Sequence, residues 1–281
     1  MNIIHDIASL KEELSIRRDK GSRIGFVPTM GALHQGHLSL MHNCVTTCDF
    51  SVASIYVNPT QFNDKNDFQR YPRNRDQDCE LLHRTHCDVV FIPSDEEMYP
   101  EPDQRIFDFG MMGEIMEGKH RPGHFNGVAQ IVTRLFEAVE PDTVFFGQKD
   151  FQQLAIIRKL VAEMHYPITI VACPIIREPD GLAMSSRNIL LTEEERRAAP
   201  LIYQTLSEVK ELIGHKTVTK IEEHVKTRIN SSSCLRLEYF QMVNTNSLES
   251  INEILPYIPV TACIAVYAGK IRLIDNIELI S

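Results

Sequence analysis

The first two-thirds of the chain alternates short apolar runs with segments of helical periodicity. The apolar runs are nearly continuous, which is typical of strands that are buried on both faces. The predicted strands cover residues 24–27, 51–57, 88–93, 143–147 and 168–175, and the predicted helices cover residues 37–47, 76–86, 130–139 and 151–164. This alternation predicts a doubly wound α/β fold around a parallel sheet.

The pattern changes after about residue 176. Thr192 and Glu195 match a helix capping box, which predicts a long helix that runs to about residue 213. A second helix is expected at 221–229, and strands are expected at 237–243, 261–269 and 271–279. We therefore predict two domains, residues 1–176 and a smaller C-terminal α+β domain of residues 177–281, with a hinge near residues 177–181.

Composition narrows the classes of function. The formal net charge of −9 argues against a nucleic-acid binder, which normally carries a basic face, but it allows an anionic small molecule in a local basic pocket. The N-terminal residues do not read as a secretory signal, and no apolar stretch approaches the roughly 20 residues of a membrane span. The expectation is a cytoplasmic protein that binds neither nucleic acid nor membrane.

Seven scattered cysteines then read as reduced, mostly buried thiols. A metal site is an alternative, because Cys44 and Cys48 have helical i, i+4 spacing and His83, His86 and Cys87 lie close together. No second ligand pair completes such a site, so no metal ligand is predicted.

The stretch PTMGALHQGHLSLM, residues 28–41, lies where the first predicted strand gives way to a helix. Gly31 permits a tight turn, and Gly36 keeps side-chain bulk away from the helix start. The first N–H groups of a helix are unpaired and its dipole is positive there, which favours phosphate. His34 and His37 would add hydrogen-bond donors to the same anion; the plain alternative is that both are surface cap residues.

Three further polar segments follow predicted strands or precede helices, and in an α/β sheet such segments converge on a ligand. Residues 56–73 form a long loop in which Gln61 offers a neutral amide. Residues 117–127 contain Arg121, His124 and Gly127, and residues 147–153 contain Lys149, Asp150 and Gln153. A connecting loop, a turn with a cap and a helix N-cap are the respective plain alternatives.

Residues 184–187, Met-Ser-Ser-Arg, place two hydroxyls and a guanidinium on the proposed hinge. Such a segment can close on a triphosphate and stabilise its departing charge, whereas a Ser-rich linker is the plain alternative.

Together these segments resemble one family. The HxGH pattern of His34, Gly36 and His37 matches adenylyl-transferring Rossmann-like enzymes, and residues 184–187 are similar to their KMSKS-type loop. The stretches FVPTMGALHQGH, YVNPTQF, RPGHFNGV, FGQKDFQQ and DGLAMSSRN resemble the pantothenate synthetase family specifically. The likeness covers about residues 25–191 and resumes weakly in RLIDN, residues 272–276.

The resemblance implies a Rossmann-like fold and an ATP-dependent ligase of coenzyme A biosynthesis. Its substrates would be ATP, (R)-pantoate and β-alanine, with pantoyl adenylate as intermediate and AMP and pyrophosphate as products. A pantoate carboxylate is already ionised at neutral pH, so the first step requires alignment and charge stabilisation and no enzymic base. Mg²⁺ would be carried on the ATP phosphates, and the enzyme would be a homodimer.

The resemblance also implies residue roles. His37 would be the principal catalytic residue, assisted at the phosphates by His34, Lys149, Ser185 and Arg187, while Asp150 would face the ribose. Gln61 and Gln153 would bind pantoate, and Gln61 would also place β-alanine. The full implied ATP site is Met30, Gly31, Ala32, Leu33, His34, Gln35, Gly36, His37, Gly147, Gln148, Lys149, Asp150, Ile176, Met184, Ser185, Ser186 and Arg187, with no chemical role for Gln148.

Three alternatives stay open at this level. A related nucleotidylyltransferase would use the same two motifs on a phosphorylated acceptor, but it would call for more cationic groups than the neutral amides of YVNPTQF and FQQL. An aminoacyl-tRNA synthetase fragment conflicts with the acidic balance and the lack of an RNA-binding extension. A silent binding protein would keep the fold, but intact His34, His37, Lys149 and Arg187 argue against lost catalysis.

Overall fold

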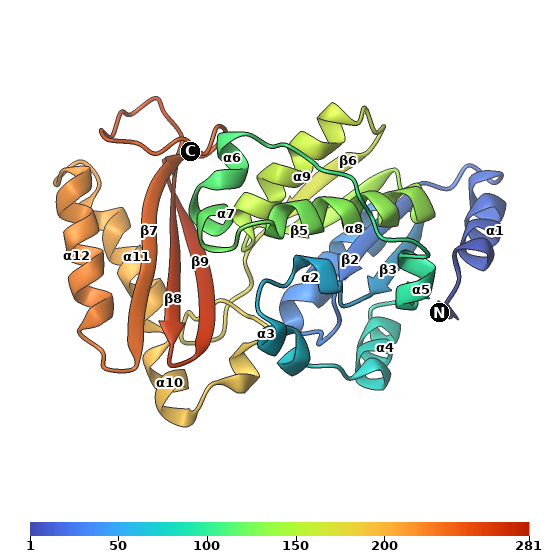
Figure 1. Cartoon of the computed structure of the whole chain (residues 1–281), viewed down its shortest axis with the longest axis horizontal. Coiled ribbons are helices and arrows are strands. Elements are labelled where there is room, and N and C mark those ends of the chain that lie inside the picture. The colour runs from blue at the N-terminus through green and yellow to red at the C-terminus, as the bar shows by residue number, and fades with distance from the viewer. Residues whose placement is uncertain (281) are drawn as a thin grey trace. The chain divides into compact units, whose positions relative to one another are not determined.

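The computed structural model describes residues 1–280, apart from the side chain of residue 65; Ser281, the last residue of the predicted second domain, lies outside this range. Within that range the strands form a six-stranded parallel sheet, the large sheet, and a three-stranded antiparallel sheet, the small sheet (Figure 1). By its contacts the chain divides into a first unit, Met1–Gln148 with Gln153–Pro174, and a second unit, Lys149–Gln152 with Ile175–Ser281. The predicted α/β fold with a smaller α+β part is confirmed.

The large sheet has the spatial order β1-β4-β3-β2-β5-β6. From β2 the chain proceeds to β3 and β4 on one side and then returns to place β5 and β6 on the other. The order therefore reverses between β2 and β5, and doubly wound folds bind ligands beyond the carboxyl ends of strands at such a point. The strands are β1 (Asn2–Ile4), β2 (Ile24–Thr29), β3 (Phe50–Ile55), β4 (Val89–Phe91), β5 (Thr143–Gly147) and β6 (Thr169–Cys173).

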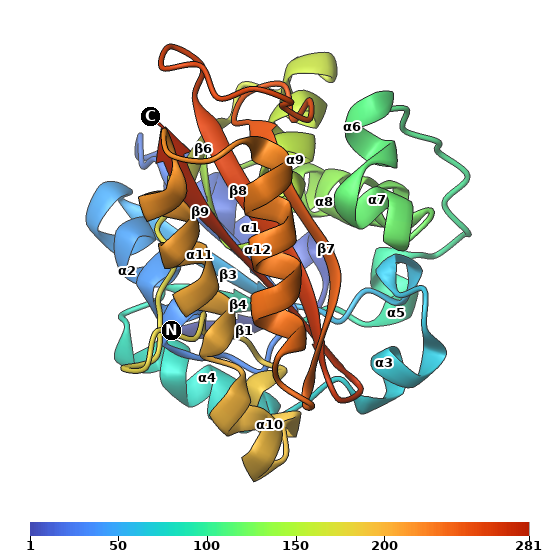
Figure 2. The ribbon, with the colours of Figure 1, turned by 90° about the vertical axis from the view of Figure 1, so that its left-hand side faces the viewer.

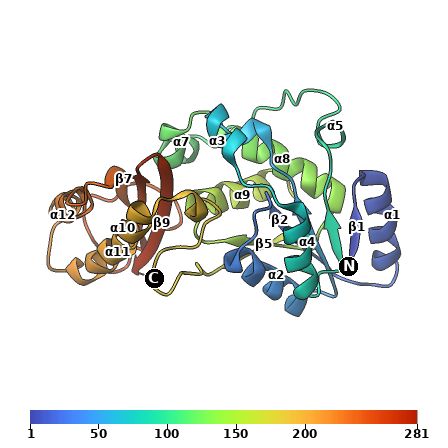
Figure 3. The same cartoon turned by 90° about the horizontal axis from the view of Figure 1, so that it is seen from below.

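Helices cover both faces of the large sheet (Figure 3). Phe26 of β2 and Val144 of β5 pack in one apolar cluster with α1 (Ile7–Arg18), α8 (His124–Val139) and α9 (Phe151–Glu163). The next residue of each strand, Val27 and Phe145, packs in a second cluster with α2 (Gln35–Thr47) and α4 (Arg75–Arg84). Successive side chains of a strand point to opposite faces, so a strand buried on both faces must be apolar throughout. This is why the runs in the sequence do not alternate.

Short helices lie in the connections of the first unit: the 3₁₀ turn η1 (Pro59–Gln61), α3 (Lys65–Arg70), α5 (Asp95–Met98), α6 (Met111–Glu114) and α7 (Met116–His120). The sequence patterns predicted neither these nor β1 and α1. β1 is only three residues long and pairs with β4 far along the chain, so its pairing leaves no local pattern.

The second unit packs helices on one face of the small sheet (Figure 2). Its strands are β7 (Leu235–Asn244), β8 (Val260–Ala268) and β9 (Ile271–Ile280), and its helices are α10 (Glu193–Ala198), α11 (Leu201–Leu212) and α12 (Val218–Asn230), with the 3₁₀ turn η2 (Asn188–Leu190). The capping box is confirmed, because Glu195 N donates to Thr192 Oγ1 (3.3 Å) and Thr192 N donates to Glu195 Oε2 (2.8 Å).

The single long helix predicted from residue 192 to about 213 is wrong. It is divided into α10 and α11, and Pro200 stands at the division. Proline has no N–H, and its ring conflicts with the carbonyl four residues earlier, so a new helix begins after it. Within residues 1–280, no helix combines the length and apolar character needed to cross a membrane.

Candidate functional site

The turn after β2 contains two successive residues with a left-handed backbone conformation. Gly31 and Ala32 both have positive φ, at 78° and 50°. This region is open to glycine but costs a non-glycine residue such as Ala32 about 1 kcal/mol or more. These two residues lie five and six positions before His37, at the carboxyl end of the strand next to the switch point.

Asp78 of α4 stabilises this turn. Ala32 N donates to Asp78 Oδ2 (2.8 Å), and Leu33 N donates to Asp78 Oδ1 (2.7 Å). Thr29 Oγ1 accepts from Gly31 N (3.1 Å) and donates to Ser54 O of β3 (2.6 Å). Asp78 is 2% exposed, and burial raises the pKa of its carboxyl group, while the two backbone hydrogen bonds lower it. Three successive N–H groups of the turn are thus fixed before any ligand binds.

His34 and His37 together cap α2. His34 Nδ1 accepts from Gly36 N (3.1 Å), His37 Nδ1 lies 3.3 Å from His34 N, which donates to it, and the two ring centroids are 4.1 Å apart. An Nδ1 atom that accepts a hydrogen bond carries no proton, so each neutral ring carries its proton on Nε2. The caps therefore set the tautomer and make Nε2 the donor atom of both rings.

One part of the expectation about this helix is wrong. Two of its first N–H groups are not unpaired, because Gly36 N donates to His34 Nδ1 and His37 N donates to His34 O (2.8 Å). The plain reading of the two histidines as caps and the chemical reading are compatible, since capping through Nδ1 leaves the protons on Nε2. Gln35 is the exposed first residue of α2.

Gln61 is fixed at both its backbone and its side chain. Its carbonyl oxygen accepts from His124 Nδ1 (2.8 Å) and Arg121 Nη2 (3.5 Å). Asn58 Nδ2 donates to Gln61 Oε1 (3.2 Å), while Gln61 Nε2 donates to Met30 Sδ (2.9 Å). The amide nitrogen of Gln61 is thereby turned toward the turn after β2, and the loops after β2 and β3 and the start of α8 converge as predicted.

Asn58 is a residue to which the sequence analysis gave no role. It is 1% exposed; its Nδ2 also donates to Gly127 O (3.1 Å), and its Oδ1 accepts from Tyr99 OH (2.8 Å). A Cβ on Gly127 would lie 2.4 Å from Thr60 O, so glycine lets α8 approach η1 closely. A polar residue between a strand and a turn gives no signal by itself.

Asp78 was also missed, although a signal existed. Asp78 and Leu82 are the buried residues of α4, at i, i+4 spacing on its inner face. A carboxylate on the buried side of a helix requires a partner, and the strained turn supplies two N–H groups.

The segment after β5 begins in the first unit and continues in the second. Gly147 ends β5, and the exposed Gln148 donates its N–H to Cys173 O (2.9 Å). Gln153 lies half-buried in the first turn of α9. Lys149 is half-buried and Asp150 is exposed.

In the second unit, residues 176–184 form a small hairpin. Arg177 and Ala183 form an antiparallel bridge, Met184 N donates to Ile176 O (3.0 Å), and Gly181 turns the chain with φ of 94°. Residues 184–187 follow directly: Ser185 Oγ accepts from Arg187 N (3.2 Å), and Ser186 is buried. The Ser-rich stretch is thus an ordered turn on a hairpin.

Comparison with known proteins identifies the family. The profile of the pantoate-beta-alanine ligase family matches residues 2–278. The chain is 52% identical over 278 residues to a pantothenate synthetase of Porphyromonas gingivalis and 50% identical over 278 residues to one of Bacteroides thetaiotaomicron, covering 99% of the chains in each case.

The chain belongs to the pantoate-beta-alanine ligase family. The resemblance found from the motifs is therefore confirmed. Solved structures agree: a pantothenate synthetase from Thermus thermophilus aligns over 100% of both chains with a TM-score of 0.93 and 37% identity. The pantoate-beta-alanine ligase from Francisella tularensis, complexed with beta-gamma ATP and beta-alanine, aligns over 99% of this chain and 98% of that chain with a TM-score of 0.82 and 35% identity.

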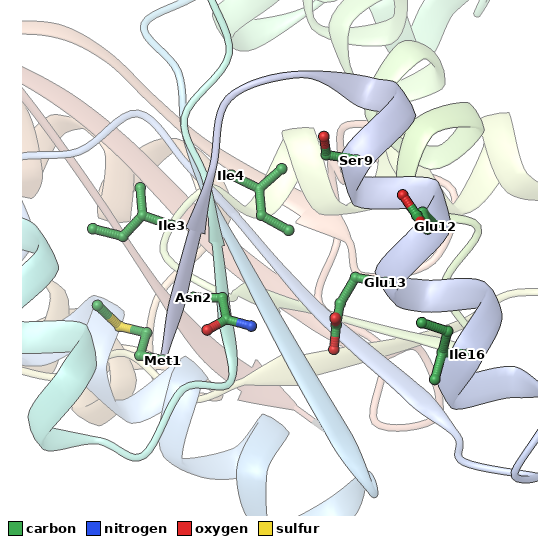
Figure 4. A pocket seen from close by; sticks show the side chains of 8 residues that line it. All are labelled: Met1, Asn2, Ile3, Ile4, Ser9, Glu12, Glu13 and Ile16. Atoms are coloured by element: carbon green, nitrogen blue, oxygen red, sulfur yellow. The ribbon is translucent and has the colours of Figure 1, made fainter.

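Of two hollows in this ligase-family chain, one is lined by candidate residues and the other is not. A cavity of 290 Å³ beyond β2 and β3 is lined by Met30, Gly31, Tyr56, Arg73 and Asp78, among others. A larger surface hollow between β1 and α1 is lined by Met1, Asn2, Ile3, Ile4, Ser9, Glu12, Glu13 and Ile16 (Figure 4). The second hollow contains no candidate residue, and its two glutamates do not suit an anionic substrate.

Within residues 1–280, no group of three or more His, Cys, Asp and Glu side chains is arranged to hold a metal ion. Cys44 and Cys87 are buried, and burial raises the pKa of both thiols, that of Cys87 to about 12. Such thiols are unreactive packing residues of this ligase-family fold.

Proposed function

We propose that this chain joins (R)-pantoate to β-alanine at the expense of ATP, through pantoyl adenylate. The proposal rests on the two imidazoles after β2, which cap α2 through Nδ1 in a member of the pantoate-beta-alanine ligase family. The pantoate carboxylate attacks the α-phosphate and pyrophosphate leaves. The amine of β-alanine then attacks the acyl carbon, and AMP leaves as pantothenate forms.

The residues of the chain supply binding and charge stabilisation. His37 donates from Nε2 to the phosphate oxygens as charge moves toward pyrophosphate, and His34 assists it. Lys149, Ser185 and Arg187 act on the phosphates, and Asp150 binds the ribose. No enzymic base is needed in the first step, because the attacking carboxylate is already ionised.

Pantoate is assigned to neutral amides. Gln61, oriented by Asn58 and Met30, donates its Nε2–H to pantoate and also places β-alanine. Gln153, in the first turn of α9, is the second pantoate ligand. The remaining members of the proposed ATP site are those that the sequence motifs gave, with the amides of Ala32 and Leu33 engaged by Asp78 instead of phosphate.

We propose that Mg²⁺ is carried on the ATP phosphates, as the family resemblance implies, because an ion held by phosphate oxygens and water needs no cluster of protein ligands. We further propose that the enzyme is a homodimer, as the family resemblance implies, and that it is cytoplasmic, as the sequence indicates; light scattering of the purified protein tests the dimer.

The test of function measures AMP and pyrophosphate release from ATP, with pantoate and β-alanine each added or omitted. We expect pyrophosphate only when pantoate is present, and AMP turnover only when β-alanine is present as well. ATP binding with neither product would overturn the proposal in favour of a silent relative, and product formation with a phosphorylated acceptor alone would favour a nucleotidylyltransferase.

A further inference from the structure

Asp275 and Asn276 are buried polar residues in the middle of β9. They are 4% and 7% exposed, and they pair with Ile264 and Cys263 of β8. Removing a carboxylate from water is unfavourable unless a charged partner and hydrogen bonds compensate for it. Burial raises the pKa of Asp275, against the opposing positive charges of Arg177 and Lys149. Two successive buried polar residues in the middle of a strand call for a function.

Asp275 holds the Ile176–Met184 hairpin through Arg177. Arg177 Nη1 donates to Asp275 Oδ2 (2.6 Å) and Arg177 Nη2 donates to Asp275 Oδ1 (2.9 Å), a bidentate pair. The same guanidinium donates to Gly181 O (3.1 Å), across the hairpin turn, and stacks 3.8 Å from the ring centroid of Tyr203. Base and tip of the hairpin are therefore fixed by a single side chain, and residues 184–187 leave from this fixed hairpin.

Asn276 contacts the segment Lys149–Gln152, which contains other residues of the proposed ATP site and also belongs to the second unit. Its Nδ2 donates to Lys149 O (3.0 Å), and its own carbonyl oxygen accepts from Arg177 Nη2 (3.4 Å). Asn276 N in turn donates to Asp275 Oδ1 (2.8 Å). Two consecutive residues of one strand thus contact both the Lys149 backbone and the hairpin that carries Ser185 and Arg187.

We propose that Asp275 and Asn276 are positioning residues for ATP: they fix Lys149 and the 184–187 segment to one strand, so that their phosphate-binding groups keep one mutual geometry. The inference rests on the proposed function. It gives a physical reason for Asp275 and Asn276 in the otherwise isolated RLIDN stretch. Displacing such groups by about 1 Å lowers the rate by about 100-fold, so an anchor of this kind has a measurable effect.

The same sheet offers a matched control. Arg272 of β9 pairs with Glu238 of β7 through Nε (2.8 Å) and Nη2 (2.6 Å) to Oε2, with both side chains mostly buried. This Arg–carboxylate pair joins two strands of the small sheet. The hydrogen bonds described for it contact neither the Ile176–Met184 hairpin nor Lys149. Glu238→Gln therefore tests what a weakened sheet does by itself.

The experiment compares Asp275→Asn, Asn276→Ala and Glu238→Gln with the wild type in the full-length protein. Pantoate-dependent pyrophosphate release gives kcat and the KM values, and calorimetric titration with ATP gives its Kd in the same samples. For Asp275→Asn and Asn276→Ala we expect kcat to fall about 10- to 100-fold and the Kd and KM for ATP to rise about tenfold. The KM for pantoate should stay within about twofold, because Gln61 and Gln153 belong to the first unit.

Glu238→Gln should lower the thermal midpoint while leaving the ATP parameters unchanged. Asn276→Ala removes no charge, so it remains informative if Asp275→Asn does not fold. The inference is overturned if the Asp275 and Asn276 variants match Glu238→Gln in kcat and in the Kd for ATP. If the wild type binds ATP but releases no pyrophosphate with pantoate, the proposed function fails, and the ATP titration still decides the role of Asp275 and Asn276.

Discussion

The turn after β2 and the Ile176–Met184 hairpin present candidate groups in two different ways. In the turn, the candidate catalytic side chains are held by local contacts: His34 and His37 cap the helix that follows, and these hydrogen bonds set the tautomers of both rings. The hairpin carries none of the proposed phosphate ligands in its turn. It presents the segment that follows it, and it is held by β9, almost a hundred residues further along the chain.

Each region nevertheless relies on a buried carboxylate of its own. Asp78 accepts two backbone N–H groups of the turn, and Asp275 accepts both arms of the Arg177 guanidinium. A carboxylate that accepts from backbone N–H groups fixes main-chain geometry directly. A carboxylate that accepts from a side chain fixes the main chain only through that side chain. The comparison teaches that the turn should tolerate fewer changes than the hairpin.

The largest effect should come from His37→Asn. Asn places its amide oxygen where His37 Nδ1 accepts from His34 N, so the cap of α2 is retained while Nε2 is lost. We expect single-turnover adenylate formation to fall about 100- to 1,000-fold, with unfolding by urea nearly unchanged.

The control for this change is His42→Asn, an exposed histidine of the same helix with no proposed role. A rate for His37→Asn close to that of His42→Asn would remove His37 from the reaction and leave it as a cap residue.

The next effect should come from Asp78→Ala. Ala32 and Leu33 would lose their acceptor, and the positive φ of Ala32 would lose its compensation. We expect kcat to fall about 10- to 100-fold and the free energy of unfolding to fall by about 1–3 kcal/mol.

Asp76→Ala provides the comparison, since Asp76 lies exposed in the first turn of the same helix. If both aspartate variants keep full activity in the pyrophosphate assay, the turn holds its shape without Asp78 and the contrast with the hairpin disappears.

A matched pair of glycine substitutions compares the regions directly. In Gly31→Ala the new Cβ would lie 2.9 Å from Asp78 Oδ2, and in Gly181→Ala it would lie 2.5 Å from Tyr203 Cδ1, with φ of 78° and 94°. Both should cost about 1–2 kcal/mol of stability, measured by urea unfolding.

Their activities should differ. Gly31→Ala should lower kcat, because the strain falls next to the imidazoles, whereas Gly181→Ala should chiefly raise the KM for ATP by a few-fold. Equal effects on kcat and KM from both variants would contradict the separation of the two regions.

The features that depend on local sequence could be predicted, whereas those that depend on distant residues could not. The α/β pattern, the helix after β2 and the convergence of Gln61, His124 and Met30 could be read from apolar runs and from polar residues at strand ends. These features depend on neighbours in sequence or on the general rule for strand ends.

The anchors could not be read in this way. Asp78 and Asp275 act on partners 46 and 98 residues away, and the three residues of β1 form a strand only because β4 is present. The helix broken at Pro200 shows a different failure, because helical periodicity continues on both sides of the proline and hides the break. The individual roles of the site residues, including Asp150 and Gln153, stay predictions.

The smallest effect should come from Thr192→Ala. Thr192 and Glu195 form the capping box of α10, and α10 touches the hairpin through an exposed ion pair between Arg196 Nη1 and Asp180 Oδ2 (2.5 Å). Losing the cap should cost about 1 kcal/mol of stability by urea unfolding, and Thr192→Ser should restore most of it. An exposed ion pair contributes only about 0.2–1 kcal/mol, so the KM for ATP should change by less than about twofold. A larger rise would mean that α10 shares the positioning of residues 184–187, and β9 would then be one of two anchors for the hairpin.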